Sequence, residues 1–151
     1  MGTLFYTFRT FPTLLLSSLE LQNAPFIFGN LKQDLINFQD SFTKHRPTQI
    51  IGFAKGSYSR FETITINHFG RNKRVLATDI ESYVLHFPHN GFGNIKLSRR
   101  PTNTFCNWTM FQIAHIAKPL NIPVQFIHIA PKDILDLKDF LKSQYNESVE
   151  Y

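Results

Sequence analysis

The chain has 151 residues, of which 42% are hydrophobic and 18% charged, which excludes a disordered or fibrous protein. A chain of this length buries roughly two thirds of its unfolded surface in one domain, and its apolar runs are too short to span a bilayer. The formal net charge is +5, but the cations fall in short groups between Phe-rich stretches, a pattern that favours solvated loops over a nucleic-acid surface.

The first third of the chain predicts two buried strands with helical segments between them. The apolar runs Leu4–Phe8 and Gln49–Phe53 are typical of buried strands. Leu14–Leu21 fits either a short helix or another strand. Apolar residues recur at steps of three and four within Gly29–His45, which predicts an amphipathic helix that Pro47 ends.

The middle of the chain predicts short extended segments. Polar and apolar residues alternate over Glu62–His68, so we expect a strand there. Tyr83–Phe87 and Ile95–Ser98 are two further short strands. The Pro, Asn and Gly residues between them predict a tight turn, which would join these two strands as a hairpin.

The last third predicts a helix, a strand and a second helix. Asn107–Lys118 carries apolar residues at helical spacing, and Val124–Ile129 is an apolar run typical of a central strand. Asp133–Ser143 has one apolar face and predicts an amphipathic helix. We therefore expect a single α/β domain over residues 1–143 and a polar, frayed tail over 144–151.

Cysteine usage and the first residues indicate the compartment. Cys106 is the only cysteine, which excludes an internal disulfide and a zinc site built from several cysteines. No basic region precedes an apolar core near the start, and Arg9 interrupts the run that could form a signal core. We therefore expect a cytoplasmic protein that does not cross a membrane.

Strands that alternate with helices predict a three-layer α/β/α sandwich with a mostly parallel sheet. In such sheets, ligands bind beyond the carboxyl ends of the strands. Three residues fall where chemistry could take place: Glu62 starts one strand, Cys106 stands just before a helix, and His128 lies near the end of the last strand.

Cys106, His128 and Glu62 each have a structural interpretation as well. A free cysteine is more often packed than reactive, and a histidine in an apolar strand is usually a core residue. Glu62 could be a surface carboxylate paired with Arg60 or Lys55. Spacing alone therefore leaves a packing role open for Cys106 and His128, and a surface ion pair open for Glu62.

Four segments carry recognisable motifs. Thr104–Asn107 (TFCN) and Phe126–Pro131 (FIHIAP) are similar to a T-F-V-C-N segment and a G-F-I-H-I/V-P segment. Pro47–Gly56 (PTQIIGFAKG) looks like P-D-x-x-I-x-x-G-x-A-x-G, and Glu62–Asn67 (ETITIN) is similar to E-R-x-A-x-N. These are motifs of the pyroglutamyl peptidase I (pyrrolidone-carboxylate peptidase) family, so the chain resembles a shortened, divergent member.

The resemblance implies an activity and its residues. Members of the family remove an N-terminal pyroglutamyl residue from peptides and use no metal or organic cofactor. Carried over, Cys106 is the nucleophile, His128 the base and Glu62 the group that holds the imidazole. The resemblance also implies a peptide substrate with a blocked N-terminus and a homo-oligomer.

The resemblance also implies a binding pocket, with departures. Phe8 and Phe11 correspond to two aromatic residues that sandwich the lactam ring, and Phe53 stands where some members have a glutamine that helps to read the lactam. The segment Tyr6–Phe11 (YTFRTF) is a degraded form of T-G-F-x-P-F-G.

One crossover helix is lost near His89–Asn94, and strands joined by so short a segment cannot run parallel. Together with the degraded pocket motifs, this loss leaves an alternative open: a relative without activity that serves as a binding or interaction protein.

Overall fold

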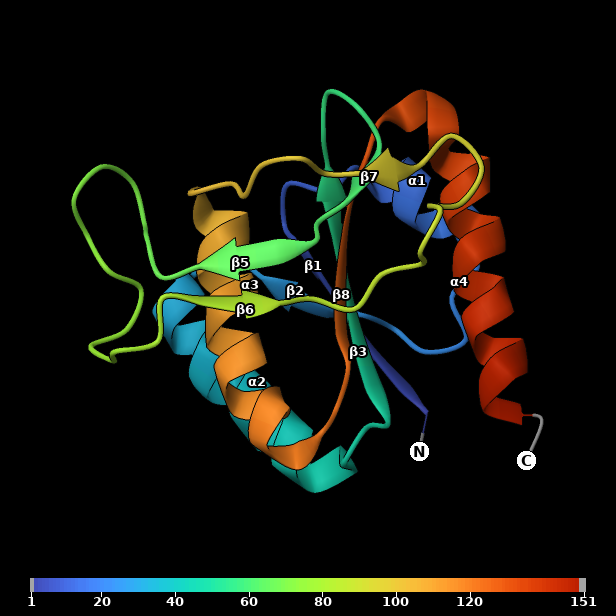
Figure 1. The fold of residues 1–151 in the computed structure, drawn as a ribbon. Coiled ribbons are helices and arrows are strands. Elements are labelled where there is room, and N and C mark those ends of the chain that lie inside the picture. The colour runs from blue at the N-terminus through green and yellow to red at the C-terminus, as the bar shows by residue number, and fades with distance from the viewer. Residues whose placement is uncertain (1, 150–151) are drawn as a thin grey trace.

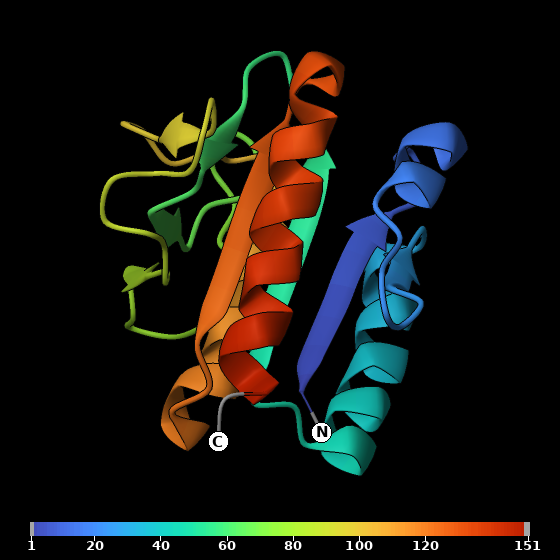
Figure 2. The same cartoon turned by 90° about the vertical axis from the view of Figure 1, so that its right-hand side faces the viewer.

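A six-stranded mixed sheet forms the centre of the molecule, with helices on both of its faces (Figures 1 and 2). The computed structural model describes residues 2–149. In chain order the elements are β1 (Thr3–Phe8), α1 (Thr13–Ser18), β2 (Phe26–Phe28), α2 (Leu31–His45), β3 (Gln49–Lys55), β4 (Arg60–Phe61), β5 (Ile64–Ile66), β6 (Ser82–Val84), β7 (Lys96–Leu97), α3 (Phe105–Ala117), the 3-10 helix η1 (Lys118–Leu120), β8 (Val124–Ile129), the 3-10 helix η2 (Pro131–Asp133) and α4 (Ile134–Val149).

The strand order of the main sheet is β2-β1-β3-β8-β4-β7. β2, β1, β3 and β8 run parallel, β4 is antiparallel to β8, and β7 is parallel to β4. β5 and β6 form a separate antiparallel pair. The prediction of a three-layer sandwich with a mostly parallel sheet is therefore confirmed.

Alternation along each strand divides the core between the two faces of the sheet. On β8, Val124 and Phe126 join the cluster packed by α2 and α3, whereas Ile127 and Ile129 join the cluster packed by α1 and α4. We call these sides the α3 face and the α4 face. His128 lies two residues after Phe126 on the same strand, so its side chain belongs to the α3 face.

Helix α3 is covered on its outer side as well. Trp108 and Phe111 pack with Val75 and Tyr83, from the segment that includes β6. In Figure 1 the β5–β6 pair lies across α3. Because α3 is enclosed from several directions, ten of its thirteen residues are buried, including the polar Asn107, Thr109 and Gln112.

The predicted hairpin is wrong. β6 pairs with β5, and β7 pairs with β4, so the two strands lie in different sheets. Leu85 packs on the α3 face, whereas Ile95 packs on the α4 face. The segment between them must therefore pass from one face of the main sheet to the other, which a tight hairpin cannot do. This segment contains no helix.

Two other boundaries differ from the prediction. Helix α3 begins at Phe105, so Cys106 lies inside its first turn instead of before it. Helix α4 continues to Val149, so the predicted boundary at residue 143 falls within it; residues 150 and 151 lie outside the described residues. The frayed tail is not seen at Gln144, because its Oε1 accepts a hydrogen bond from Nε2 of the buried Gln125 at 3.2 Å.

The two short strands β2 and β4 were not predicted from the sequence.

Among residues 2–149, no helix is both long enough and apolar enough to cross a membrane.

Candidate active site

Glu62 and His128 form a buried pair. His128 Nδ1 lies 2.7 Å from Glu62 Oε2, although 66 residues separate them in the sequence. The side chain of His128 is 6% exposed and that of Glu62 is 1% exposed. A carboxylate bonded to one ring nitrogen sets the tautomer and direction of an imidazole, which leaves Nε2 as the nitrogen that can exchange a proton with another group.

Strand β4 brings Glu62 to this position. Phe61 is opposite Ile127 in the antiparallel pairing with β8, and the Glu62 backbone N–H donates to Phe126 O at 2.9 Å. Phe61 packs on the α4 face, so its neighbour Glu62 points to the α3 face, where His128 lies. Two residues of strand pairing are thus enough to orient the carboxylate.

The first turn of α3 is anchored by Asn107. This side chain is fully buried, and its Nδ2 donates to Ile66 O and His68 O at 2.8 Å each. Its Oδ1 accepts from Ile66 N at 3.1 Å and from Thr65 Oγ1 at 2.7 Å. These four bonds tie the start of α3 to β5 and so position Cys106. This anchoring role of Asn107 was not predicted from the sequence. Its position directly after Cys106, in the segment TFCN, is the signal that could have indicated it.

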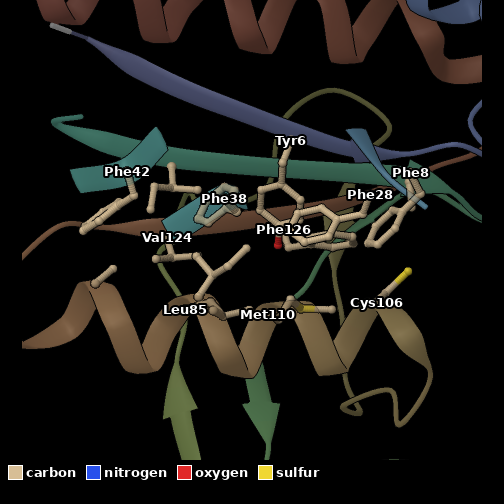
Figure 3. Close-up of a cluster of buried hydrophobic side chains, with 14 residues drawn as sticks. Tyr6, Phe8, Phe28, Phe38, Phe42, Leu85, Cys106, Met110, Val124 and Phe126 are labelled. Carbon is tan, nitrogen blue, oxygen red and sulfur yellow. The ribbon is translucent and has the colours of Figure 1, made fainter. Parts of the chain in front are cut away.

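Cys106 projects from α3 into the core of the α3 face. Figure 3 shows its sulfur on the side of α3 that faces the sheet, near Phe8. The residue is 3% exposed, and this burial raises the pKa of the thiol to about 12. A hydrogen bond with Thr104 acts against that rise, the charge of Glu62 adds to it, and the charge of Arg60 opposes it.

The structure brings Cys106 and His128 to the same face of the sheet without a direct bond. Phe126 lies in the same cluster as Cys106, and its ring centroid is 5.0 Å from that of His128. Within the described residues, no hydrogen bond joins the Cys106 sulfur to the imidazole. The three predicted catalytic residues therefore share one face of the sheet, and two of them, Glu62 and His128, are hydrogen-bonded.

A pocket of about 360 Å³ opens next to this site. Its walls are mainly aromatic and apolar: Phe8, Arg9, Thr10, Phe28, Gly29, Leu31 and Phe105. The rings of Phe8 and Phe105 meet nearly perpendicular to each other, with centroids 4.9 Å apart. Phe8 lines this pocket and also packs in the cluster that contains Cys106, so the pocket lies beside the part of the core into which the thiol projects (Figure 3).

The predicted substrate-binding residues are split between the two faces. Phe8 lies on the α3 face and lines the pocket. Phe11 and Phe53 are buried together on the α4 face, with ring centroids 5.0 Å apart. Phe53 alternates with Ala54 along β3, so the pleat turns its ring away from Cys106. Phe8 therefore lies on the opposite face of the sheet from Phe11 and Phe53, so the three rings do not line one pocket.

Arg60 is the further polar residue of the site. Its Nε donates to Glu62 Oε2 at 2.7 Å, the oxygen that also contacts His128. The pairing of Glu62 with Arg60 was predicted only as a surface ion pair, whereas the carboxylate is buried. Across residues 2–149, no three His, Cys, Asp or Glu side chains gather closely enough to hold a metal ion.

Comparisons with known proteins show what the fold is. No model of a protein family matches the sequence, and no curated protein matches it. Among solved structures, pyrrolidone carboxyl peptidase from Pyrococcus furiosus is similar with a TM-score of 0.72 and 13% identity, over 97% of this chain and 99% of that chain.

The pyrrolidone carboxyl peptidase from Thermococcus litoralis is similar with a TM-score of 0.69 and 14% identity, over 97% of this chain and 95% of that chain. The chain, which resembles this family in its motifs, therefore has the pyrrolidone carboxyl peptidase fold.

Proposed function

We propose that this protein is a cysteine peptidase that removes an N-terminal pyroglutamyl group, or a similar small acyl group, from peptides through a thioester. The 2.7 Å contact between His128 Nδ1 and Glu62 Oε2, on the face into which Cys106 projects, carries the proposal. A histidine held by a carboxylate near a thiol is the arrangement of nucleophilic cysteine catalysis. The likeness to pyrrolidone carboxyl peptidases supplies the substrate class.

Cys106 acts as the nucleophile and His128 as the base. With Glu62 ionised and accepting from Nδ1–H, His128 Nε2 takes the thiol proton as Sγ bonds to the acyl carbon. The C–N bond of the peptide then breaks, and Nε2 returns the proton to the leaving amine. Water attacks the thioester with the help of the same nitrogen, and the thiol is regenerated.

The first turn of α3 offers donors for the oxyanion. The first N–H groups of a helix have no partner within it, and no side chain of the described residues caps this turn. Trp108 N already donates to Thr104 O at 3.1 Å, which leaves the N–H groups of Phe105, Cys106 and Asn107 without a partner within the helix, and the N–H of the nucleophile Cys106 is the candidate donor to the substrate oxygen. Such a donor lowers the barrier by roughly 3–4 kcal/mol in other hydrolases.

Catalysis requires the sulfur and the imidazole to come together. At neutral pH the thiol is protonated, because burial raises its pKa to about 12. We therefore infer that bound substrate draws Cys106 Sγ toward His128 Nε2, since catalytic hydrogen bonds commonly tighten in the complex. The thiolate would then form during attack and would not be present in the free enzyme.

The acyl group would occupy the pocket beside Phe105. Apolar walls from Phe8, Phe28 and Leu31 suit a small, largely apolar ring. None of the lining residues is Asn or Gln, so no side-chain amide is available to read a lactam. For this reason the proposal includes small acyl groups other than pyroglutamyl.

Two observations favour the alternative of a binding protein without activity. The Cys106 thiol has a strongly raised pKa, and within the described residues it makes no hydrogen bond to His128. Phe11 and Phe53 are also buried away from the site. In this alternative the pocket would bind an acyl group or peptide without cleaving it.

Turnover of a fluorogenic pyroglutamyl amide separates the two functions. The peptidase predicts hydrolysis by the wild type, an acyl adduct on Cys106 by mass spectrometry, and loss of both in Cys106→Ala. Lys142→Ala, an exposed change in α4, serves as the matched control and should keep full activity. A folded wild type that neither hydrolyses nor forms an adduct with the pyroglutamyl amide, or with amides of other small acyl groups, would exclude the peptidase.

The proposal includes a homo-oligomer in the cytoplasm. Leu14 of α1 and Leu135 of α4 are exposed apolar side chains that association would cover. Sedimentation equilibrium at micromolar concentration tests this part, and a monomer would remove it without affecting the proposed chemistry.

A further inference from the structure

Arg60 is held beside the Glu62–His128 pair by three contacts. Its Nε donates to Glu62 Oε2 at 2.7 Å, and its Nη1 donates to Tyr58 O at 3.2 Å. The guanidinium carbon also lies 4.4 Å from the centre of the Tyr58 ring, a cation–π distance. The side chain is 15% exposed, so one guanidinium reaches from the rim of the site to a buried carboxylate.

The backbone is built to allow this approach. Arg60 is directly opposite His128 in the β4–β8 pairing, and Glu62 follows Arg60 by two residues on the same side of the chain. A Cβ added to Gly56 would lie 2.9 Å from His128 Cβ and 3.2 Å from Arg60 Nη1. Gly56 therefore leaves the space in which the two side chains meet the same carboxylate.

A buried carboxylate needs a cation when its histidine is neutral. Glu62 is 1% exposed, and an ionised carboxylate without a charged partner is costly at such depth. The imidazole of a general base must be neutral before it accepts a proton, so it cannot supply the charge in the resting enzyme. Arg60 is the cation in contact with Glu62 and carries its charge throughout the cycle.

We propose that Arg60 is a positioning residue of the catalytic site, which holds the Glu62 carboxylate with Oε2 directed at His128 Nδ1 and balances its charge when Cys106 ionises. This inference rests on the proposed function, because Glu62 is its partner in the peptidase mechanism. Thiolate formation at Cys106 is opposed by the charge of Glu62 and favoured by that of Arg60, which supports the geometric argument.

Three variants and two readouts test the role of Arg60. Arg60→Gln removes the charge, Arg60→Lys keeps it, and Arg71→Gln is a matched control at an exposed arginine. The first readout is the rate at which iodoacetamide alkylates Cys106 at pH 8, which follows the thiolate fraction. The second is turnover of the fluorogenic pyroglutamyl amide.

We expect Arg60→Gln to slow alkylation by about threefold to tenfold, the effect of removing a nearby opposite charge. Turnover should fall by about a hundredfold because Glu62 and His128 lose their fixed direction. Arg60→Lys should restore alkylation to within about twofold of wild type. Arg71→Gln should behave as wild type in both readouts.

The outcomes separate the role of Arg60 from the proposed function. Wild-type alkylation and turnover in Arg60→Gln would overturn the role of Arg60 while leaving the peptidase intact. Slowed alkylation that lysine restores, in a protein that never turns over the amide, would support Arg60 and reject the peptidase. If Arg60→Gln fails to fold, Arg60→Lys decides: a wild-type alkylation rate supports the charge role, and a loss as large as that expected for glutamine overturns it.

Discussion

The parallel strands and the segment from residue 56 to residue 104 hold their backbone in different ways. β3 and β8 pair continuously from Ile50 and Val124 to Lys55 and Ile129. The strands of the segment have only two or three residues, and the side chains of two buried asparagines, Asn67 within the segment and Asn107 in α3, supply further hydrogen bonds to its backbone. Where Asn107 ties α3 to β5, Asn67 bonds the backbone of Leu76 and Ile80.

This difference bears on the candidate site, because Glu62 comes from the segment and His128 from the regular strands. Because the strands of the segment are short, only a few specific bonds hold the Glu62 carboxylate in place. Small changes in the segment should therefore disturb the site before they unfold the sheet. The regular strands carry the apolar core, so changes there should act on the whole fold. The predictions below test this contrast.

The largest effect is expected in the regular part. Phe126 is fully buried on β8, and its ring packs with those of Tyr6, Phe8 and His128. Phe126→Ala should lower the free energy of unfolding by about 4 kcal/mol, the usual cost of removing a buried phenyl ring. Urea denaturation measures this loss. A change below about 1 kcal/mol would contradict the assignment of Phe126 to the core.

The second effect is expected at Asn107, where α3 anchors the segment. Asn107→Ala removes four hydrogen bonds and leaves part-buried backbone groups of Ile66 and His68 without these partners, which should cost about 3 kcal/mol. Hydrogen exchange should rise first in β5 and the start of α3. Asn103→Ala is the control, because that exposed side chain makes one bond, to Gly70 O at 3.2 Å. Equal losses in both variants would refute the anchoring role.

The third effect concerns pH and Cys106. The folded protein raises the pKa of the thiol from 9.0 to about 12, so the unfolded chain ionises first as pH rises. The stability that this group contributes is complete below pH 9 and is lost as pH rises toward 12, with a slope of at most about 1.4 kcal/mol per pH unit.

Unfolding curves between pH 8 and about 11 test the sign of this linkage. The wild type should lose stability more steeply than Cys106→Ala, which lacks the thiol. The buried Tyr6 hydroxyl, whose pKa is raised mainly by burial, contributes to both proteins, and only the smaller part of that rise that comes from the charge of Cys106 is lost in Cys106→Ala. Parallel curves would show that the Cys106 thiol is not desolvated.

The smallest effect is expected at the pocket. Phe105 is 39% exposed, so Phe105→Ala should cost only about 1 kcal/mol of stability. If the acyl group binds against this ring, KM for the pyroglutamyl amide should rise by about tenfold while kcat changes little. Leu120→Ala, at an exposed apolar residue of η1, is the control. An unchanged KM would place the acyl group elsewhere.

Long periodic elements were predictable because their pattern is repeated along the chain. The predicted strand Val124–Ile129 matches β8 residue for residue, and the predicted helix over Gly29–His45 contains α2. β4 has two residues, too few for any period to show, so the strand that orients Glu62 could not be predicted. The hairpin prediction failed because turn-forming residues do not specify which strands pair.

The sequence by itself determined the layered α/β fold, the order of its main elements and, through motif resemblance, the three residues of the candidate triad. Tertiary structure decided that Glu62 meets His128 and Arg60, that Phe8 is separated from Phe11 and Phe53, and that the Cys106 thiol is buried without a bond to the imidazole. Periodicity and motifs are local properties of the chain, whereas hydrogen-bond partners, desolvation and pocket walls depend on which distant surfaces meet when it folds.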